Sequence, residues 1–438
     1  MNDTFADGTF GTNTYDVAVV GAGIAGLVAA VTAAEAGSRV VLIDSHEPGG
    51  RARTTVREGF AHNIGPHALY LAGHLQPFLD ARGMSPSGGI PPNGSVGLLR
   101  DGQLWQLSMG IMGVAKSKLL SPRGRARFLS LMARLPRMKT DRFVGTTWQS
   151  WLGNEPDDVA GVVRMFVRVA TYGDAEARFD AAAALDQLKL ALRGVRYIDH
   201  GWQTIVDSLA ARFVSLGGTL RSGCTVLNID VEDGADGVAV ETSAGSLRAT
   251  AAVIAGLAPD AVQRITAATI SGRAEQGSTL HAASLDLALN RQHAGIVFGI
   301  DEPLYLSPHA PVAKLAPTGC GLVSLLRYAP DGETPEAGSI PLVRGRLREL
   351  ATMAGIADTD ILHERYQHRL VVANSFPAAD AGGLRGRPAA DALGLPGVFV
   401  AGDWVGPEFQ LVDAASASAE AAARRALTHV ASVSRVGV

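Results

Sequence analysis

Three glycines and one carboxylate near the N-terminus have the spacing that a phosphate-binding turn requires. Gly21, Gly23 and Gly26 follow the apolar run 17–20, and Asp44 ends a second apolar run. Gly21 permits a tight turn, Gly23 lets a pyrophosphate approach the backbone, and Gly26 lets a helix pack closely on a strand. A carboxylate at Asp44 would accept hydrogen bonds from ribose hydroxyls and repel a 2′-phosphate, which argues against NADP.

These residues need a strand, a helix and a second strand to position them. The run 17–20 predicts a buried parallel strand, 27–36 an Ala-rich helix and 39–43 another strand. The first turn of the helix would offer free N–H groups and a partial positive charge to phosphates. The pattern therefore predicts dinucleotide binding, and the alternative is a glycine-rich corner that binds nothing.

The residues after Asp44 indicate which dinucleotide is bound. They continue through Ser45 into Gly49-Gly50-Arg51. At this point the chain resembles the FAD-dependent amine oxidase and phytoene desaturase superfamily, in which the ribose acid is followed by a Gly-Gly-Arg motif. The resemblance implies FAD as the cofactor and places Arg51 near the pyrophosphate and the flavin.

A second motif of the same superfamily lies near the C-terminus. An apolar run ends in Gly402-Asp403, and an Ala-rich helix is expected from Leu411 to about residue 430. The resemblance implies that Asp403 binds the ribityl or pyrophosphate region. It also implies that the backbone at Leu411 and Val412 faces the flavin pyrimidine, where the helix dipole would stabilise negative charge.

Two weaker matches lie between these motifs. Gly65-Pro66-His67 corresponds to a loop that passes the flavin ring in the superfamily, and His67 could act as an acid or base or orient the substrate. The alternative is a histidine that only shapes its loop. Val226 matches a residue whose backbone contacts adenine, and the alternative is an unrelated strand of the same sheet. The predicted cofactor contacts are Gly21, Gly23, Ile24, Ala25, Gly26, Asp44, Ser45, Gly50, Arg51, Gly65, Pro66, His67, Val226, Gly402, Asp403, Leu411 and Val412.

The two strong motifs must meet to enclose one cofactor, although they lie at opposite ends of the chain. The predicted fold is therefore α/β, with a discontinuous Rossmann-like FAD-binding domain and an α+β substrate domain that carries a helical cap. We expect 14–84, 199–260 and 391–432 to form the FAD-binding domain. We expect 85–198 to supply the helical part of the substrate domain and 261–390 its sheet.

The resemblance implies an enzyme that transfers hydride from a substrate C–H to flavin N5. Amine oxidases place an aromatic ring near the position of Leu411, so this departure disfavours an amine. The Gly-Pro-His loop and the Gly-Asp-Trp sequence favour phytoene desaturase-like chemistry on an apolar or isoprenoid-like substrate. Tyr172, Trp404 and Phe409 are candidates for the substrate pocket, with core packing as the alternative for Tyr172. Lys314 is a weak candidate for holding a water at N5.

A non-catalytic binding protein is the remaining alternative. Rab GDP-dissociation inhibitors and escort proteins resemble this fold without using flavin, and they bind protein and prenyl lipid. Such a protein is expected to lack the turn glycines or the Gly-Asp pair. This chain keeps Gly21, Gly23 and Gly26 together with Gly402-Asp403, which favours the oxidoreductase.

Charge and composition restrict the partners. The net charge of -3 gives no reason to expect nucleic acid, and Cys224 and Cys320 form no metal or redox spacing. We expect no metal site, a small-molecule substrate and a cytoplasmic location, and the oligomeric state is left open. The basic helices at 116–142 are either a solvated face or a peripheral membrane contact. Residues 1–13 are polar and are expected to form a loose tail.

Overall fold

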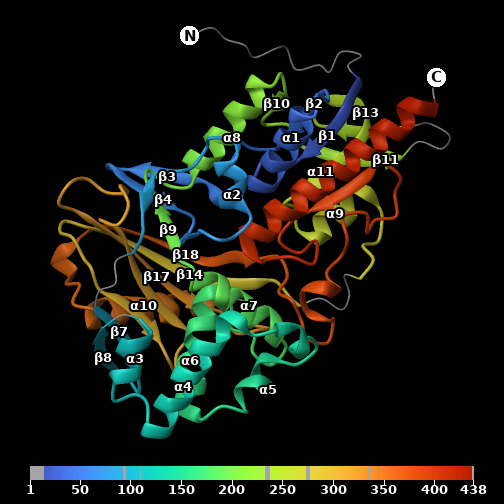
Figure 1. Ribbon diagram of the computed structural model, residues 1–438. Coiled ribbons are helices and arrows are strands. Elements are labelled where there is room, and N and C mark those ends of the chain that lie inside the picture. The colour runs from blue at the N-terminus through green and yellow to red at the C-terminus, as the bar shows by residue number, and fades with distance from the viewer. Residues whose placement is uncertain are drawn as a thin grey trace.

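Two seven-stranded sheets organise the molecule (Figure 1). The structure is a computed structural model that describes residues 14–91, 95–108, 110–231, 237–272, 277–333 and 336–436. The tail expected at 1–13 lies outside the described residues. One sheet carries the glycine turn and the Gly-Asp motif, and the other lies beneath it in Figure 1, above the helices α4–α7.

The first sheet draws strands from three distant parts of the chain. Its order is β10-β2-β1-β13-β12-β11, and β19 pairs with residues 252–255 of β13, beyond the part of β13 that pairs with β12. Pairing is parallel except along β11-β12-β13, which is antiparallel. The bounds are β1 Thr14–Val20, β2 Val40–Ile43, β10 Thr219–Arg221, β11 Val226–Val231, β12 Val238–Thr242, β13 Gly245–Ala255 and β19 Val398–Ala401. Because β1, β13 and β19 are adjacent, the two termini of the chain share one sheet.

Small side chains let three helices pack closely against this sheet. α1 (Ile24–Glu35) lies beside α11 (Leu411–Val436), and α8 (Gln203–Ser215) flanks α1. The prediction placed the first helix at 27–36, but it begins three residues earlier, directly after Gly23. A Cβ on Gly26 would lie 1.6 Å from the carbonyl oxygen of Gly21. Glycine at position 26 is therefore what allows this helix to start so close to its strand.

The second sheet has the order β18-β14-β17-β16-β15-β7-β8. Its bounds are β7 Ser95–Arg100, β8 Gln103–Ser108, β14 Leu280–Leu289, β15 Ile296–Gly299, β16 Leu304–Ala310, β17 Gly321–Tyr328 and β18 Ile361–Ala373. β7 and β8 form a hairpin in which Arg100 pairs with Gln103. The strand β16 was not predicted from the sequence. It contains Pro308, which coincides with the register shift between β16 and β17.

A helical layer covers one side of the second sheet, as the sequence predicted. Leu280, Ala282, Leu326 and Tyr328 of the sheet share a core with these helices. The bounds are α3 Ile111–Lys116, α4 Pro122–Arg134, η2 Leu135–Arg137, η3 Thr140–Phe143, α5 Trp148–Leu152, α6 Asp157–Thr171 and α7 Ala181–Ala191. This layer closes the lower end of the molecule in Figure 1.

Smaller elements join the two halves. The strand β9 runs from the helical layer back toward the first sheet and pairs with β5 and β6. The remaining bounds are η1 Gly50–Ala52, β3 Thr54–Arg57, β4 Phe60–Asn63, β5 Leu69–Tyr70, α2 Leu75–Asp80, β6 Gly88–Gly89, β9 Val195–Ile198, α9 Pro259–Thr266, η4 Ala337–Ser339, α10 Ile340–Met353, η5 Asp358–Asp360 and η6 Gly383–Gly386.

Candidate active site

One cavity connects the glycine turn, the Gly-Asp motif and the second sheet. It is lined by segments that lie hundreds of residues apart in the sequence. The lining residues are Gly21, Gly23, Ile24, Ala25, Asp44, Gly49, Gly50, Arg51, Ala52, Ile64, Gly65, Pro66, His67, Ala68, Tyr70, Tyr172, Trp202, Ala255, Gly256, Leu257, Leu326, Arg369, Leu370, Val371, Val372, Asp403, Leu411, Val412 and Ala415.

The glycine turn presents free backbone N–H groups to this cavity. Gly21 has φ +100°, and a Cβ there would lie 2.3 Å from the carbonyl oxygen of Ala255. Gly23 is the N-cap of α1 and supplies no side-chain cap, while a Cβ on Gly23 would meet nothing within 4 Å. Ile24 and Ala25 follow as the first helical residues and line the cavity. Their uncapped N–H groups make this a ready anion-binding site.

Asp44 lies beside the turn, as the motif predicted. Its Oδ2 accepts a hydrogen bond from the N–H of Ala22 at 2.6 Å, and its Oδ1 accepts one from the N–H of His46 at 2.8 Å. The carbonyl of Asp44 accepts from the N–H of Cys224 at 2.9 Å, which brings the start of β11 and Val226 into its neighbourhood. Ser45 is exposed, and its hydroxyl bonds the Nδ1 of His46.

An ion pair links the Gly-Gly-Arg motif to the Gly-Asp motif. The Arg51 Nη1 lies 2.8 Å from Asp403 Oδ2 and also donates to the carbonyl of Val372 at 3.2 Å. Asp403 is 1% exposed, and its carboxylate also accepts from the backbone N–H and the Nδ2 of Asn374. Asn374 was not predicted from the sequence. It follows directly after β18, and the sequence there matches no motif. These contacts fix the Asp403 side chain as part of the cavity wall.

The N-terminus of α11 also points into the cavity. Leu411 has φ 55° and begins the helix, and Val412 lines the cavity after it. Phe409 also has a left-handed backbone, and the buried Gln410 between them donates its Nε2 to the carbonyl of Ala183 at 2.9 Å. This bond stabilises a turn that non-glycine residues rarely adopt.

Two buried ionisable groups surround this helix start. Burial raises the pKa of Asp413 to about 6, and its Oδ1 accepts from the N–H of Leu75. Burial lowers the pKa of Arg387 to about 10, and its Nη1 donates to the carbonyl of Phe409 at 2.9 Å. Neither was predicted from the sequence, because each depends on contacts between distant segments.

His67 lines the cavity beside the Gly-Gly-Arg segment, with the backbone of Arg51 facing its ring. Its Nδ1 lies 3.1 Å from the carbonyl oxygen of Gly65, and this contact is a hydrogen bond when Nδ1 carries the proton. Burial lowers its pKa, and the indole of Trp202 packs edge-on at 5.1 Å between ring centroids. The Gly65 and Arg51 backbones oppose the effect of burial by raising this pKa, and a neutral imidazole can accept a proton on the ring nitrogen that carries no hydrogen.

The walls around His67 are apolar or aromatic. The Tyr70 hydroxyl donates to the carbonyl of Ala170 at 2.7 Å, and Tyr172 ends α6 with φ 54°. Burial raises the pKa of both tyrosines, so both stay neutral near pH 7. Leu326 and Leu370 complete this end.

Two predicted substrate-pocket residues lie elsewhere, which corrects the expectation for them. Trp404 is 0% exposed in the core beneath the first sheet, and its Nε1 donates to the carbonyl of Leu257 at 3.0 Å. Phe409 lines a second pocket beside α7. The weak candidate Lys314 has a 77% exposed side chain and lies 3.9 Å from Asp199. Trp404 and Phe409 are close to Asp403 in sequence but do not line the cavity, because the chain turns away from it after Asp403.

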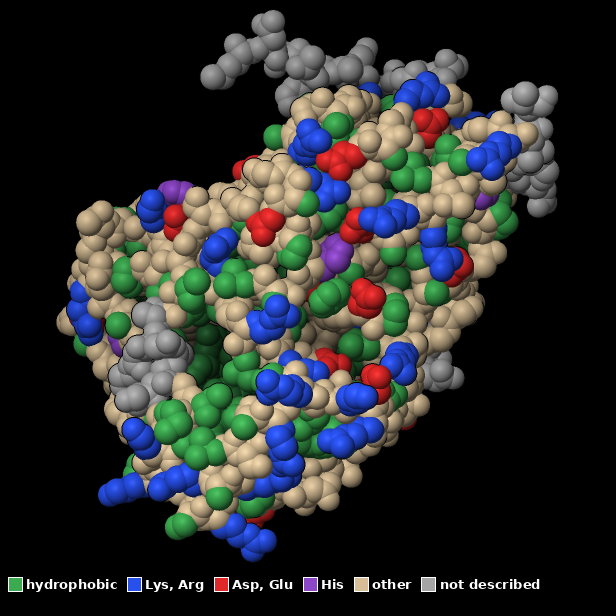
Figure 2. Space-filling view, viewed as in Figure 1, with side chains coloured by type: hydrophobic (Ala, Val, Ile, Leu, Met, Phe, Trp, Pro, Cys, Tyr) green, Lys and Arg blue, Asp and Glu red, His purple; other side chains and the backbone are tan. Residues whose placement is uncertain are grey.

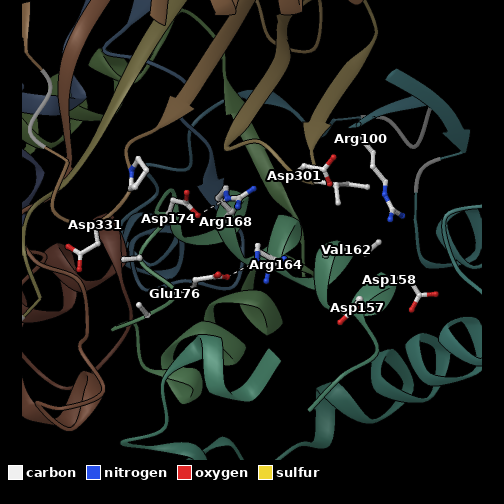
Figure 3. A pocket seen from close by; sticks show the side chains of 15 residues that line it. Arg100, Asp157, Asp158, Val162, Arg164, Arg168, Asp174, Glu176, Asp301 and Asp331 are labelled. Atoms are coloured by element: carbon white, nitrogen blue, oxygen red, sulfur yellow. Dashed lines mark hydrogen bonds and ion pairs between the residues drawn. The ribbon is translucent and has the colours of Figure 1, made fainter. Parts of the chain in front are cut away.

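A polar depression lies alongside α6 (Figure 3). Its charges are largely paired within the protein, with Arg164 2.6 Å from Glu176 and Arg168 3.0 Å from Asp174. Within the described ranges, no three His, Cys, Asp or Glu residues are placed to hold a metal ion. This depression therefore offers no reactive group comparable to those of the central cavity.

Comparison with known proteins agrees with this geometry. A family described as "NAD(P)-binding Rossmann-like domain" matches residues 19–81. Among curated proteins, none matches the sequence of this chain. Many solved structures match, and three of them, which are 14–16% identical to this chain, are described next.

Three of these structures span almost the whole chain. Putrescine oxidase bound to putrescine has a TM-score of 0.73 and 16% identity over 95% of this chain and 100% of its own. A putative protoporphyrinogen oxidase from Exiguobacterium sp. 255-15 has a TM-score of 0.69 and 16% identity over 95% and 98%. A fatty acid isomerase from P. acnes has a TM-score of 0.70 and 14% identity over 95% and 99%.

These likenesses confirm the predicted fold class. The chain shares the fold of these structures, and residues 19–81 match a Rossmann-like domain. Within the described part of the chain, no helix has both the length and the apolar composition needed to cross a bilayer.

Proposed function

We propose that the protein is an FAD-dependent oxidoreductase that takes hydride from a substrate C–H, in phytoene desaturase-like chemistry on an apolar or isoprenoid-like substrate. The observation that carries the proposal is the shared cavity. The uncapped start of α1 with Asp44 and the start of α11 with Asp403 both line it. Two helix N-termini at one cavity suit a ligand that carries negative charge at two places.

The residues present fit FAD. The open space over Gly23 leaves room for a pyrophosphate, which the N–H groups of Ile24 and Ala25 would bind. Asp44 would accept hydrogen bonds from the ribose, and Arg51 would add positive charge near the pyrophosphate. When bound, FAD supplies the hydride acceptor, and the start of α11 would stabilise the negative charge that follows reduction.

The substrate end of the cavity favours an apolar molecule. The carboxylates among the lining residues are Asp44 and Asp403, and Asp403 is already bonded to Arg51 and Asn374. A substrate ammonium at the His67 end would therefore find no adjacent carboxylate among these residues. The tyrosine and leucine walls instead exclude water and would position a C–H bond.

His67 is the candidate for proton transfer. Forming a C=C bond by hydride removal releases a proton from the neighbouring carbon. Neutral His67 can accept that proton on the ring nitrogen that carries no hydrogen, while its contact with the Gly65 carbonyl orients the ring.

Amine or amino-acid oxidation is the second candidate. Tyr70 and Tyr172 bring two aromatic rings to the cavity, and aromatic rings can attract an ammonium group. A putrescine oxidase also shares the fold. A non-catalytic lipid-binding protein is the remote third candidate, which the retained glycine turn disfavours.

Two alanine substitutions distinguish an effect on cofactor binding from an effect on the stability of the fold. A Cβ on Gly23 meets no protein atom within 4 Å, whereas a Cβ on Gly26 meets the Gly21 carbonyl at 1.6 Å. Gly23→Ala should therefore keep the thermal stability of the apoprotein while weakening FAD binding at least about tenfold, since the methyl group occupies the space proposed for pyrophosphate. Gly26→Ala should lower the free energy of unfolding by about 3 kcal/mol or more.

The measurement combines a flavin-binding titration with thermal unfolding of the apoprotein. Isolated flavin should be identified by chromatography after denaturation. A Gly23→Ala protein that binds FAD as tightly as the wild type would contradict the proposed site. Gly26→Ala serves as the control for damage to the turn itself.

A further inference from the structure

A basic surface without acidic residues lies at the end of the molecule opposite the glycine turn. Residues 102–140 contain eight Lys and Arg and no Asp or Glu. This segment forms β8, α3, α4 and η2, and we call its exposed face the α3–α4 surface. In Figure 2, Lys and Arg side chains gather with apolar ones over the lower end of the molecule, where α3 and α4 lie in Figure 1.

Most of these cations are not neutralised by the protein. Arg127 pairs with the buried Glu155, and Arg125 donates to the carbonyl of Ser117. The nearest acid at the start of α4, Asp158, already accepts from the N–H of Ser121. Six others are exposed and form no ion pair with any described residue: Lys116, Lys118, Arg123, Arg134, Arg137 and Lys139.

Large apolar side chains are exposed beside these cations. Trp105 on β8 is 41% exposed, and Ile111 and Met112 in the first turn of α3 are 37% and 56% exposed. α3 packs against both β8 and α4 and ends at Lys116, so these apolar residues lie on the same packed elements as the cations. An apolar and aromatic edge surrounded by Lys and Arg is typical of segments that lie in the interfacial region of a bilayer.

An apolar pocket opens at the other end of this surface. Its lining residues include Leu135 and Pro136 of η2, together with Leu190, Leu192, Leu384, Pro407 and Phe409. Gln187 lies in its wall and donates to the carbonyl of Ala170, which also accepts from the Tyr70 hydroxyl. Because Tyr70 lines the central cavity, the Ala170 carbonyl connects a side chain in the wall of this pocket with one in the wall of that cavity.

We propose that the α3–α4 surface docks on an anionic lipid bilayer. The six cations pair with lipid phosphates, while Trp105, Ile111 and Met112 enter the headgroup region. A second copy of this chain fits the α3–α4 surface less well than an anionic bilayer does. A two-fold interface would bring the same patch together with itself, and the six unpaired cations would repel their counterparts. The adjacent apolar pocket suits a lipid surface as a source of apolar molecules.

Vesicle flotation of the full chain tests this proposal. The protein should float with vesicles of phosphatidylcholine and phosphatidylglycerol but not with phosphatidylcholine alone, and added salt should weaken binding. Each cation near an anionic surface contributes about fivefold, so Lys116→Gln with Lys118→Gln should weaken partitioning by at least about tenfold. Trp105→Ser with Met112→Ser should also weaken it, by removing apolar insertion.

Matched controls lie on the other faces of the molecule. Leu342 on α10 is 77% exposed, so Leu342→Ser removes an exposed apolar side chain outside the surface. Arg264 in the last turn of α9 is exposed, so Arg264→Gln removes a cation outside it. Both controls should float like the wild type, and all variants should keep the same thermal stability and flavin content.

Three results would overturn the proposal. The first is that the wild type floats equally well with neutral and with anionic vesicles. The second is that the surface variants and the control variants lose vesicle binding to the same extent. The third is that the protein binds no vesicles, while the Trp105→Ser, Met112→Ser variant differs from the wild type in sedimentation coefficient. The last would identify an interface between copies of the chain. Failure of flavin binding would instead count against the proposed function alone, because flotation does not depend on the cofactor.

Discussion

The protonation state of one histidine decides what the substrate end of the cavity can do. The contact with the Gly65 carbonyl orients the His67 ring, and burial lowers the pKa of the ring. His67 is therefore neutral at physiological pH and can accept a proton on the ring nitrogen that carries no hydrogen.

His67→Gln should slow flavin reduction by about 10²-fold or more, because glutamine cannot accept a proton. Flavin content and thermal stability should stay unchanged, since the glutamine amide keeps a donor for the Gly65 carbonyl. Rapid mixing with substrate under anaerobic conditions measures this rate. In the wild type, the lowered pKa should keep the rate constant as pH falls to 6.5, with loss only below that value. A His67→Gln protein reduced at the wild-type rate would leave His67 with a role only in loop structure.

At the scale of elements, the two halves of the molecule meet through buried polar side chains. β4 contributes His62, and β14 and β18 contribute Asp286 and His363. The Nε2 atoms of His62 and His363 lie 3.1 Å apart, and Arg365 pairs with Asp286 at 2.6 Å. At that separation, the two histidines are bonded only if at least one ring is neutral, so acid should weaken this junction.

His309 on β16 is a second buried histidine whose protonation should weaken the fold, and burial lowers its pKa strongly. Its ring is stacked on Tyr197 at 4.1 Å, and burial lowers its pKa from 6.5 to about 4. Since the unfolded chain binds this proton more tightly, the contribution of neutral His309 is present above pH 6.5 and is lost as pH falls toward 4. The free energy of unfolding should fall by about 3 kcal/mol across this window.

The comparison of wild type with His309→Phe by urea unfolding at several pH values measures that contribution. The phenylalanine keeps the stacking on Tyr197 and cannot titrate, so its stability should depend less on pH between 6.5 and 4. Equal pH dependence in both proteins would show that other groups, such as His293 and His363, cause the loss.

Local patterns in the sequence predicted the elements that carry the cofactor site. Glycine spacing and apolar runs placed Gly21, Gly23 and Asp44 correctly, because the β1–α1–β2 unit is local in sequence. The same reasoning misplaced Trp404 and missed Asn374 and Arg387. Their positions depend on where β18 and the turn before α11 lie relative to each other, and no short pattern encodes such a contact.

At the scale of the whole molecule, the chain closes one cavity by bringing its ends together. β1, β13 and β19 are neighbours in one sheet, and the Arg51–Asp403 ion pair joins the first motif to the last. The second sheet contributes apolar walls, and the helical layer carries the basic surface on its outside. The cofactor would thus lie at the first sheet, the substrate beside the second sheet, and the lipid surface against the outside of the helical layer.

Anaerobic bleaching of the FAD-loaded protein tests the central claim most directly. A panel of polyenes and isoprenoids should be compared with a panel of amines and amino acids, following flavin absorbance. The proposed function predicts bleaching by a polyene or isoprenoid and none by amines. Bleaching by an amine alone would favour the second candidate, and a protein that can neither retain nor be loaded with FAD would contradict the account.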